Sequence, residues 1–496
     1  MRFADVRNRT RRAGASIPPP WPYRWLMDPA DDRPEDEVSQ DGDGDTDEAE
    51  EAITPTPPSR TRILLAVVVA IAVTAAFLAG TVGALLRGGT QGDGAEANDS
   101  GMLAIVDLDG RLLVMGPDGS TPRQLPVPDT AFQFPAWSPD GSRIAAPVTR
   151  LDGSGAVLVV DPRSDASDSQ PTTLYSSPDR VPFYLSWAPD GSHVAFLTSE
   201  PDSIALRSAP ADASSPARVV RIGSPMYWDW IDDGHLFIHA GGTFDEAFVG
   251  EAAIGRESDA TSSLRPGFFR PPALGGDRTY RAVVAQEDGA SVISIETSDP
   301  ADRKNVPVRG SVAMTFDPTG TSLAYTATDT DTSEPPPLPV GPLRLVDPRT
   351  GSERVLLDSD VVAFFWSPDG RTIATLRFPQ PGDPGDSDLA ATRVASADVD
   401  LAAEEAPGIP LTLAFLTAAT GEVQSERAVR VSDVFASQVI PFFDQYALSH
   451  RIWSRNSRAI LLPLANGTEP THLVVIPADD SAPSRVADGI IGFWTP

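Results

Sequence analysis

The sequence predicts an all-β repeat fold, and three observations support this prediction. A five-residue segment reads Trp-Ser-Pro-Asp-Gly at 137–141 and 366–370 and Trp-Ala-Pro-Asp-Gly at 187–191, with a looser copy at 316–320. Pro, Asp and a left-handed Gly in this order favour a tight turn. Each copy then runs into a short apolar segment, such as 144–148. Because this strand-turn-strand unit recurs along the chain, we expect stacked hairpin repeats.

The Trp or Phe before each turn marks the repeats, which are about fifty residues long. Between 230 and 316 there is room for one more repeat, for which Phe268, Phe269 and the Gly275-Gly276-Asp277 turn predict a degraded copy. Between 366 and 453 the excess length is Pro-, Gly- and Asp-rich, which predicts one repeat with long insertions. The marker positions are Trp or Phe at 137, 187, 230, 316, 366, 453 and 494.

The two ends of the repeat region complete each other. Residues 490–496 read as the innermost strand of a unit, whereas 102–107, 112–115 and 122–125 read as three strands without an inner one. Pairing the first and last segments closes a ring and removes exposed sheet edges. We therefore predict an all-β β-propeller of eight blades, with seven as the alternative if 250–300 do not form a blade.

These motifs resemble a known family. The Trp-Ser-Pro-Asp-Gly turn, the Ile-Ala-like strand after it, and strands such as Leu158-Val159-Val160-Asp161 are similar to the TolB-type, WD40-like (PD40) β-propeller repeat. The resemblance covers nearly all of 101–496 and implies the fold. For function it implies partner-binding lids, scaffolds or the non-catalytic domains of prolyl oligopeptidase-like enzymes. No hydrolase domain is expected after the repeats, so we expect the chain to differ from those enzymes.

A membrane anchor is expected before the repeats. Residues 63–86 contain no charged side chain, and 24 helical residues extend about 36 Å, enough to cross a hydrocarbon core of about 30 Å. We predict a single-pass, uncleaved transmembrane helix at 62–87. Arg60 and Arg62 precede the uncharged stretch 63–86 and Arg87 follows it, and six further Arg lie within 1–27, so the N-terminus is expected in the cytoplasm. The propeller is then extracytoplasmic, and the membrane anchor and cytoplasmic tail distinguish the chain from soluble periplasmic TolB.

The remaining N-terminal segments are expected to lack a fixed fold. Residues 1–61 are basic, then acidic, then Pro-rich, which predicts a disordered cytoplasmic tail. Within this tail Trp21, Tyr23 and Trp25 form an aromatic group that suits either docking of a cytoplasmic partner or contact of the basic segment with the membrane surface. Residues 88–100 read as a flexible stalk.

The small residues of the anchor offer one way to form a homodimer. Ala76, Gly80 and Ala84 recur every four residues, a spacing that can pack two membrane helices. The same pattern also arises simply because Gly and Ala are common in membrane helices.

Composition and motifs argue against several functions. The chain of 496 residues has 69 acidic and 39 basic side chains, and its net charge of −30 repels nucleic acid. Cysteine is absent, which excludes disulfides and thiolate metal sites. The nearest serine-hydrolase string, 320–324, lacks its final Gly. His235 and His239 would lie about 13 Å apart on a strand, too far to share a metal. We predict no catalytic residue, cofactor or metal, and no enzyme activity.

Three insertions are the most informative segments for binding. Residues 329–342, 379–409 and 430–450 are all expected on one face of the ring, opposite the repeat turns. The third carries apolar side chains that the repeat does not require, and it either folds inward as a plug or presents a binding patch. The recurring Trp residues are expected to pack between blades. The residues predicted for partner binding are Phe435, Ile440, Phe442, Phe443 and Tyr446.

Three functions are compatible with these features. The leading prediction is a membrane-anchored extracytoplasmic propeller that acts as a protein- or ligand-binding scaffold, with a protein partner in the cell envelope. The first alternative is a transmembrane sensor that couples extracytoplasmic ligand binding to the cytoplasmic tail. The second is an enzyme that acts on a glycan or peptide through carboxylates of the central channel, which requires two or three of them to converge.

Overall fold

The structure is a computed structural model that describes nine stretches of the chain. The predicted tail, the predicted transmembrane helix at 62–87 and the predicted stalk up to residue 99 lie outside them, as do 329–337 and 384–407 of the predicted insertions. Within the described ranges, no helix is long and apolar enough to span a membrane. These ranges are 100–163, 170–241, 247–255, 264–267, 270–328, 338–380, 382–383, 408–466 and 469–496.

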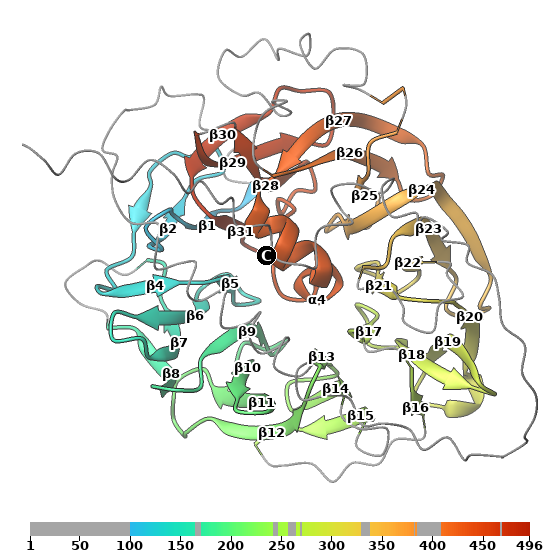
Figure 1. Cartoon of the computed structure of the whole chain (residues 1–496), viewed down its shortest axis with the longest axis horizontal. Coiled ribbons are helices and arrows are strands. Elements are labelled where there is room, and N and C mark those ends of the chain that lie inside the picture. The colour runs from blue at the N-terminus through green and yellow to red at the C-terminus, as the bar shows by residue number, and fades with distance from the viewer. Residues whose placement is uncertain are drawn as a thin grey trace, which may run out of the picture. The chain divides into compact units, whose positions relative to one another are not determined.

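From residue 100 onward the chain is nearly all-β, and its antiparallel sheets surround a common centre, as in a β-propeller (Figure 1). The first sheets along the chain have three to five strands. They contain β1 (Leu103–Val106), β2 (Leu112–Met115), β3 (Arg123–Gln124) and β31 (Ile491–Trp494); β4 (Thr130–Phe132), β5 (Ala136–Trp137), β6 (Ile144–Arg150), β7 (Gly155–Val160) and β8 (Thr172–Ser177); β9 (Pro182–Trp187), β10 (His193–Glu200), β11 (Ser203–Pro210) and β12 (Arg218–Gly223); and β13 (Met226–Trp230), β14 (His235–Ala240) and β15 (Phe248–Ala253).

The second half of the ring begins with the predicted degraded repeat, which forms a sheet of its own. The remaining strands follow one continuous hydrogen-bonded path. The degraded repeat contains β16 (Arg265–Pro266), β17 (Ala273–Leu274), β18 (Arg281–Glu287), β19 (Ala290–Glu296) and β20 (Lys304–Pro307); the continuous path contains β21 (Val312–Phe316), β22 (Leu323–Ala327), β23 (Gly341–Val346), β24 (Glu353–Trp366), β25 (Thr372–Arg377), β26 (Ile409–Thr417), β27 (Val423–Val431), β28 (Ala459–Asn466), β29 (Glu469–Pro477) and β30 (Ser484–Asp488).

The repeated turns have the geometry that their sequence predicts. In the first copy the Gly141 amide donates to the Ser138 carbonyl over 2.8 Å, and the Asp140 carboxylate accepts from the Ser138 hydroxyl at 2.6 Å and the Ser142 amide at 3.0 Å. Gly is favoured at the end of this turn because the backbone there is left-handed. The φ angles of Gly141, Gly191, Gly320 and Gly370 are 68°, 71°, 74° and 69°.

The chain ends pair with each other, as the sequence predicts. β31 is antiparallel to β1, with Leu103 opposite Trp494 and Val106 opposite Ile491. Outside the strands, the Thr495 amide donates to the Met102 carbonyl at 2.9 Å. The first sheet therefore receives its inner strand from the C-terminal end of the chain, and the ring has no open edge at this position.

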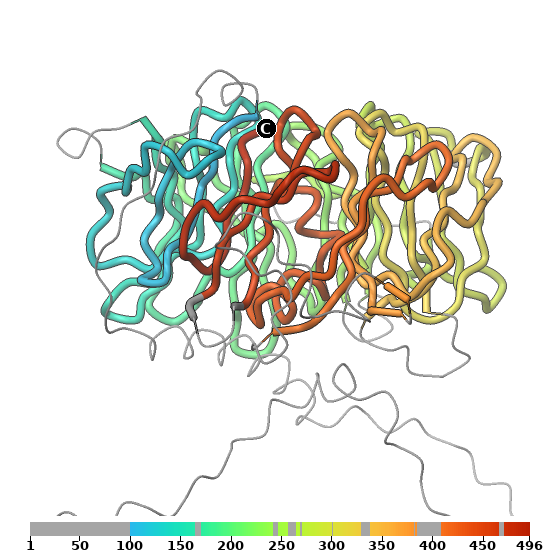
Figure 2. Tube along the Cα trace, turned by 90° about the horizontal axis from the view of Figure 1, so that it is seen from above, coloured from blue at the N-terminus to red at the C-terminus, as the bar shows by residue number. Residues whose placement is uncertain are grey.

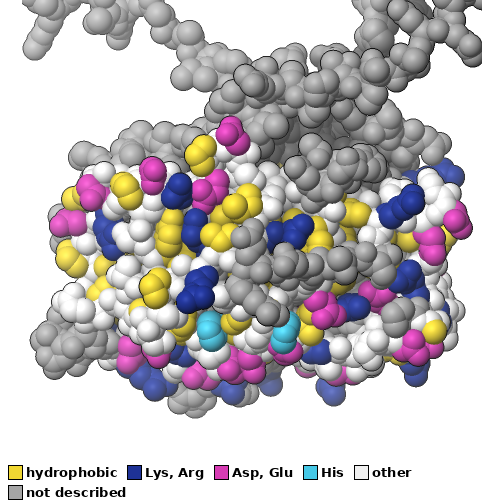
Figure 3. All heavy atoms as spheres, turned by 90° about the horizontal axis from the view of Figure 1, so that it is seen from below, with side chains coloured by type: hydrophobic (Ala, Val, Ile, Leu, Met, Phe, Trp, Pro, Cys, Tyr) yellow, Lys and Arg dark blue, Asp and Glu magenta, His cyan; other side chains and the backbone are white. Residues whose placement is uncertain are grey.

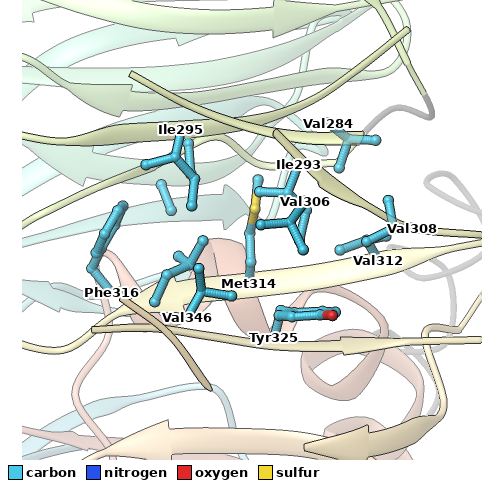
Figure 4. Close-up of a cluster of buried hydrophobic side chains, with 13 residues drawn as sticks. Val284, Ile293, Ile295, Val306, Val308, Val312, Met314, Phe316, Tyr325 and Val346 are labelled. Atoms are coloured by element: carbon cyan, nitrogen blue, oxygen red, sulfur yellow. The ribbon is translucent and has the colours of Figure 1, made fainter. Parts of the chain in front are cut away.

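Neighbouring sheets are held together by apolar side chains between their faces. In one such layer Ile293 and Ile295 of β19 lie against Val312 and Met314 of β21, and all four are buried (Figure 4). The pleat sends alternate residues of each strand into this layer. Burial of a side chain of this size contributes about 1.5–3 kcal/mol, so inter-sheet packing is a main source of stability.

One segment departs from the β pattern and fills the centre of the ring. Between β27 and β28 the chain forms a π-helical turn, η3 (Phe435–Val439), a 3-10 turn, η4 (Ile440–Phe442), and the short helix α4 (Phe443–Ala447). Figure 1 shows α4 at the centre. In Figure 2, which views the ring from the side, these helical turns lie toward one face of the ring and the C-terminus lies toward the opposite face. We call residues 435–450 the plug.

Candidate functional site

A central cavity of about 450 Å³ lies on the side of the ring opposite the plug helices. Residues of the repeated turns line it, including Pro139, Pro189, Pro318 and Pro368, and so do residues 447–453, which continue from α4. The plug therefore closes the floor of the cavity, and the turns form its rim. Its volume falls within the range of small-molecule sites, about 300–1,000 Å³.

Six tryptophans line the cavity, and the indole N–H groups of five of them join neighbouring repeats. Trp187 donates to the Ala136 carbonyl at 2.9 Å, and Trp453 donates to the Phe365 carbonyl at 3.0 Å. In each case the acceptor belongs to the residue just before the aromatic marker of the preceding repeat. The same relation holds for Trp137 with Phe493, Trp366 with Thr315, and Trp230 with the Ser186 hydroxyl.

This arrangement confirms that the recurring tryptophans pack between repeats. The exception is Trp494, whose buried Nε1 has no hydrogen-bond partner in the described chain. Because the N–H groups of the others are already used, the indoles offer the cavity mainly apolar ring surface.

The plug is anchored by aromatic side chains from several repeats. Phe443 packs edge-on against Phe364 and Phe365, with ring centroids 5.0 and 5.8 Å apart. The ring centroid of Tyr446 lies 5.2 Å from that of Phe134 and 5.3 Å from that of Tyr184. These contacts come from opposite sides of the ring, so the plug ties distant repeats together.

A buried polar network fixes the C-terminal end of the plug. The Gln445 side-chain amide donates to the Tyr184 hydroxyl and the Trp228 carbonyl, both at 3.0 Å. His450 Nε2 lies 2.9 Å from the Phe134 carbonyl and therefore carries the proton, while its Nδ1 lies 2.6 Å from the Ser449 hydroxyl. Burial lowers the pKa of His450 to about 4, so this imidazole is neutral at pH 7.

A buried ion pair holds the other end of α4. Arg270 Nη2 lies 3.3 Å from the Asp444 carboxylate, and both side chains are almost fully buried. The same guanidinium donates to the Val312 carbonyl at 2.8 Å and the Pro441 carbonyl at 3.1 Å. Burial raises the pKa of Asp444, and the charge of Arg270 opposes that shift. These bonds satisfy Arg270 inside the fold, so this pair is structural.

The two carboxylates that line the cavity are both engaged by the protein. Asp229 accepts from the Trp230 amide at 2.7 Å and the Leu274 amide at 3.1 Å, and Arg278 lies 3.6 Å from it. Burial raises the pKa of Asp229. Asp317 accepts from the Ser322 amide at 2.6 Å and from its own turn. Across the described ranges, no three His, Asp or Glu side chains are grouped as metal ligands.

Arg451 differs from every other charged side chain of the cavity lining. Among the described residues, its side chain makes no hydrogen bond, ion pair or ring contact. It is accessible to solvent, yet protein surrounds it, because it lies in a concave wall. Desolvation lowers its pKa, and the like charge of Arg455 lowers it further. An arginine still remains charged at pH 7.

The predicted partner-binding residues belong mostly to the interior. Phe435, Ile440, Phe443 and Tyr446 are buried, so the segment adopts the inward plug of the two predicted alternatives and does not form an exposed apolar patch. The physical reason is the empty centre of the ring, which their side chains fill. Phe442 is 41% exposed. Partner binding through this segment stays a prediction, and so does the role of Trp21, Tyr23 and Trp25, which lie outside the described ranges.

Sequence reasoning missed Arg451, although a signal for it exists. It stands two residues before the marker Trp453, and in the other repeats this position holds an apolar residue or Gly. Alignment of the repeats on their markers would have shown one charge in an apolar column. The other residues of this column are Pro135, Leu185, Trp228, Met314, Phe364 and Gly492.

Comparison with known proteins adds little beyond the fold. No family model and no curated protein matches the chain. Among solved structures, TolB from Acinetobacter baumannii is 14% identical over 76% of this chain and 71% of its own, with a TM-score of 0.35. The dihydro-heme d1 dehydrogenase NirN is 13% identical over 80% of this chain and 76% of its own, with a TM-score of 0.44.

A prolyl endopeptidase is 9% identical over 74% of this chain and 49% of its own, with a TM-score of 0.46. At such identities and TM-scores these likenesses carry no functional argument. The fold assignment rests on the sheets themselves.

Proposed function

We propose that the chain is a membrane-anchored, extracytoplasmic binding module whose ligand occupies the central cavity, and that it is not a catalyst. The observation that carries this proposal is the cavity itself. It has a volume of about 450 Å³, walls that combine tryptophan rings with polar groups such as Asp229, Arg278 and Arg451, and a floor formed by the plug. A concave site in which aromatic side chains surround a small number of polar groups is the usual form of a ligand pocket. The engagement of Asp229 and Asp317 by backbone amides favours binding over acid–base chemistry.

We also propose that the ring has eight blades. We divide the path from β21 to β30 into three four-stranded units. In this division the long strand β24 bends and belongs to both the first and the second unit. Residues 451–453 serve as the inner strand of the third unit. Two features support this division. The β24 ladder shifts register between Val361 and Ala363, and β27 joins β28 through the single pair Val431 and Leu464. With the five preceding sheets, this makes eight.

Ligand binding is tested with the full chain in detergent. We expect small molecules that raise the melting temperature of the unmodified protein to lose this effect in Leu448→Trp, because Leu448 lines the cavity and the larger ring fills it. Leu151→Trp is the matched control, since Leu151 is 77% exposed and does not line the cavity. A ligand that stabilises both variants equally would show that binding occurs elsewhere.

The anchor and its orientation are tested by single-cysteine labelling, because the chain contains no cysteine. Ser215→Cys lies at an exposed position of the ring, and Ser39→Cys lies in the tail. We expect a membrane-impermeant maleimide to label Ser215→Cys in intact spheroplasts and Ser39→Cys only after lysis. The reverse labelling pattern would contradict this part of the proposal, and so would recovery of the protein in the soluble fraction instead of the membrane fraction.

A further inference from the structure

We propose that Arg451 is an anion-recognition residue, and that the cavity takes a small organic carboxylate with an apolar body. The inference rests on the proposed function, because it names the ligand class of the same cavity. The Arg451 side chain is accessible to solvent within a concave, partly desolvated wall, so its guanidinium is open to a counter-charge from a ligand.

The first step of the argument is that the protein itself does not neutralise Arg451. Within the described chain its side chain has no partner, and the charge nearest to it is the like charge of Arg455. Pro496 lines the same cavity, and no ion pair joins it to Arg451. This is unusual in a chain with a net charge of −30, where acidic side chains outnumber basic ones. On the outer side shown in Figure 3, acidic and basic side chains lie intermixed.

The second step is that the other charges of the cavity cannot serve a ligand in the same way. Arg278 is 3.6 Å from Asp229, so their charges largely cancel. Asp317 is held by amides and hydroxyls of its own turn. His450 is buried and neutral at pH 7, and both of its ring nitrogens have partners. Arg451 is therefore the one charged side chain without a partner among the described residues of the cavity lining.

The third step selects the ligand class. One guanidinium offers a planar fork of donors that matches one carboxylate in a bidentate pair. Indole and phenyl rings form the apolar part of the cavity walls, and they favour an apolar body on the same molecule. A phosphate dianion would call for a second free cation in the cavity. The chemistry that fits is a monocarboxylate with an aromatic or aliphatic chain.

The test uses 4-phenylbutyrate as the probe, with 4-phenylbutyramide as its uncharged counterpart and acetate as the charge without an apolar body. Binding to the full chain in detergent is followed by titration calorimetry. We expect saturable binding of 4-phenylbutyrate at concentrations up to about 10 mM, with affinity at least about tenfold higher than for the amide or acetate. Arg451→Gln should reduce the affinity for 4-phenylbutyrate about tenfold or more, and Arg451→Lys should restore part of it.

The matched control is Arg458→Gln, an exposed arginine seven residues along the chain that does not line the cavity, and it should leave the affinity unchanged. Equal affinity for acid and amide would overturn the assignment of Arg451 without any need for a variant. If both compounds bind equally and Leu448→Trp abolishes binding, the cavity remains the ligand site and the anion inference fails. If no probe binds, or if Leu448→Trp leaves binding of 4-phenylbutyrate intact, the inference fails together with the cavity assignment.

Discussion

At the scale of single residues, the tryptophan of each repeat acts through its indole N–H as well as through its ring. Five of the six cavity-lining tryptophans donate to the preceding repeat, and Trp494 does not. The chain therefore contains a natural comparison between a satisfied and an unsatisfied N–H at equivalent, buried positions.

Replacement of these residues by Phe should separate the hydrogen bond from the ring. Trp187→Phe removes the 2.9 Å bond to Ala136, whereas Trp494→Phe removes a buried N–H that has no partner. Both lose similar ring volume. We expect Trp187→Phe to lower the free energy of unfolding by about 1–2 kcal/mol more than Trp494→Phe does. Urea denaturation measures the difference, and equal losses would show that the indole bonds do not stabilise the ring.

The buried histidines should make the fold sensitive to acid. Burial lowers the pKa values of His239 and His450 from about 6.5 to about 4. The rings of Tyr184, Tyr446 and Phe493 surround His450, and no charged group faces it in these contacts. Between pH 7 and pH 5 the unfolded chain takes up protons at these residues and the folded chain does not, so stability falls as pH falls, by about 2 kcal/mol per histidine.

The measurement is the urea midpoint at pH 7 and pH 5. His450→Gln should show a shallower loss than the unmodified chain, whereas the exposed His235→Gln should follow the unmodified chain. An unchanged pH dependence in His450→Gln would mean that His450 is not held neutral by burial.

At the scale of elements, the sequence predicted the hairpins well and the plug incompletely. Turn residues such as Gly141 and Gly320 specify a left-handed backbone locally, so their hairpins are readable from the sequence alone. Whether residues 430–450 fold into the ring or lie on its surface depends on tertiary packing. Phe443 carries no local signal that tells a buried plug from an exposed patch, because its partners Phe364 and Phe365 are distant in sequence. Arg451 was readable only by comparison between repeats.

Two adjacent phenylalanines test whether the plug is internal. Phe443 is fully buried and Phe442 is 41% exposed. We expect Phe443→Ala to lower the free energy of unfolding by about 3–5 kcal/mol, and Phe442→Ala to change it by less than about 0.5 kcal/mol. Thermal or urea unfolding measures both. Similar small effects from the two variants would contradict the inward packing of the plug and return weight to the binding-patch alternative.

At the scale of the whole molecule, closure of the ring depends on a few residues at the C-terminal end. β31 supplies the inner strand of the first sheet through its pairing with β1. Because the paired segments lie almost four hundred positions apart, local propensity cannot specify this contact, and the sequence predicted it only through the incomplete repeats at both ends.

Removal of 491–496 should therefore open the first sheet. Within the ring, we expect limited proteolysis to cleave this truncated chain at new sites in residues 100–125, since β1 to β3 lose their inner neighbour. Removal of Pro496 alone is the control, because this residue lies outside β31. Cleavage patterns that are the same in both truncated chains would show that closure does not protect this sheet.

The measurement that tests the central claim most directly is a crystal structure of the full chain grown with 4-phenylbutyrate. The account predicts density in the central cavity, with the carboxylate of the compound paired to the Arg451 guanidinium and its ring against the tryptophan walls. Density for the compound on the plug face near Phe442, or in the cavity with its carboxylate turned away from Arg451, would contradict it.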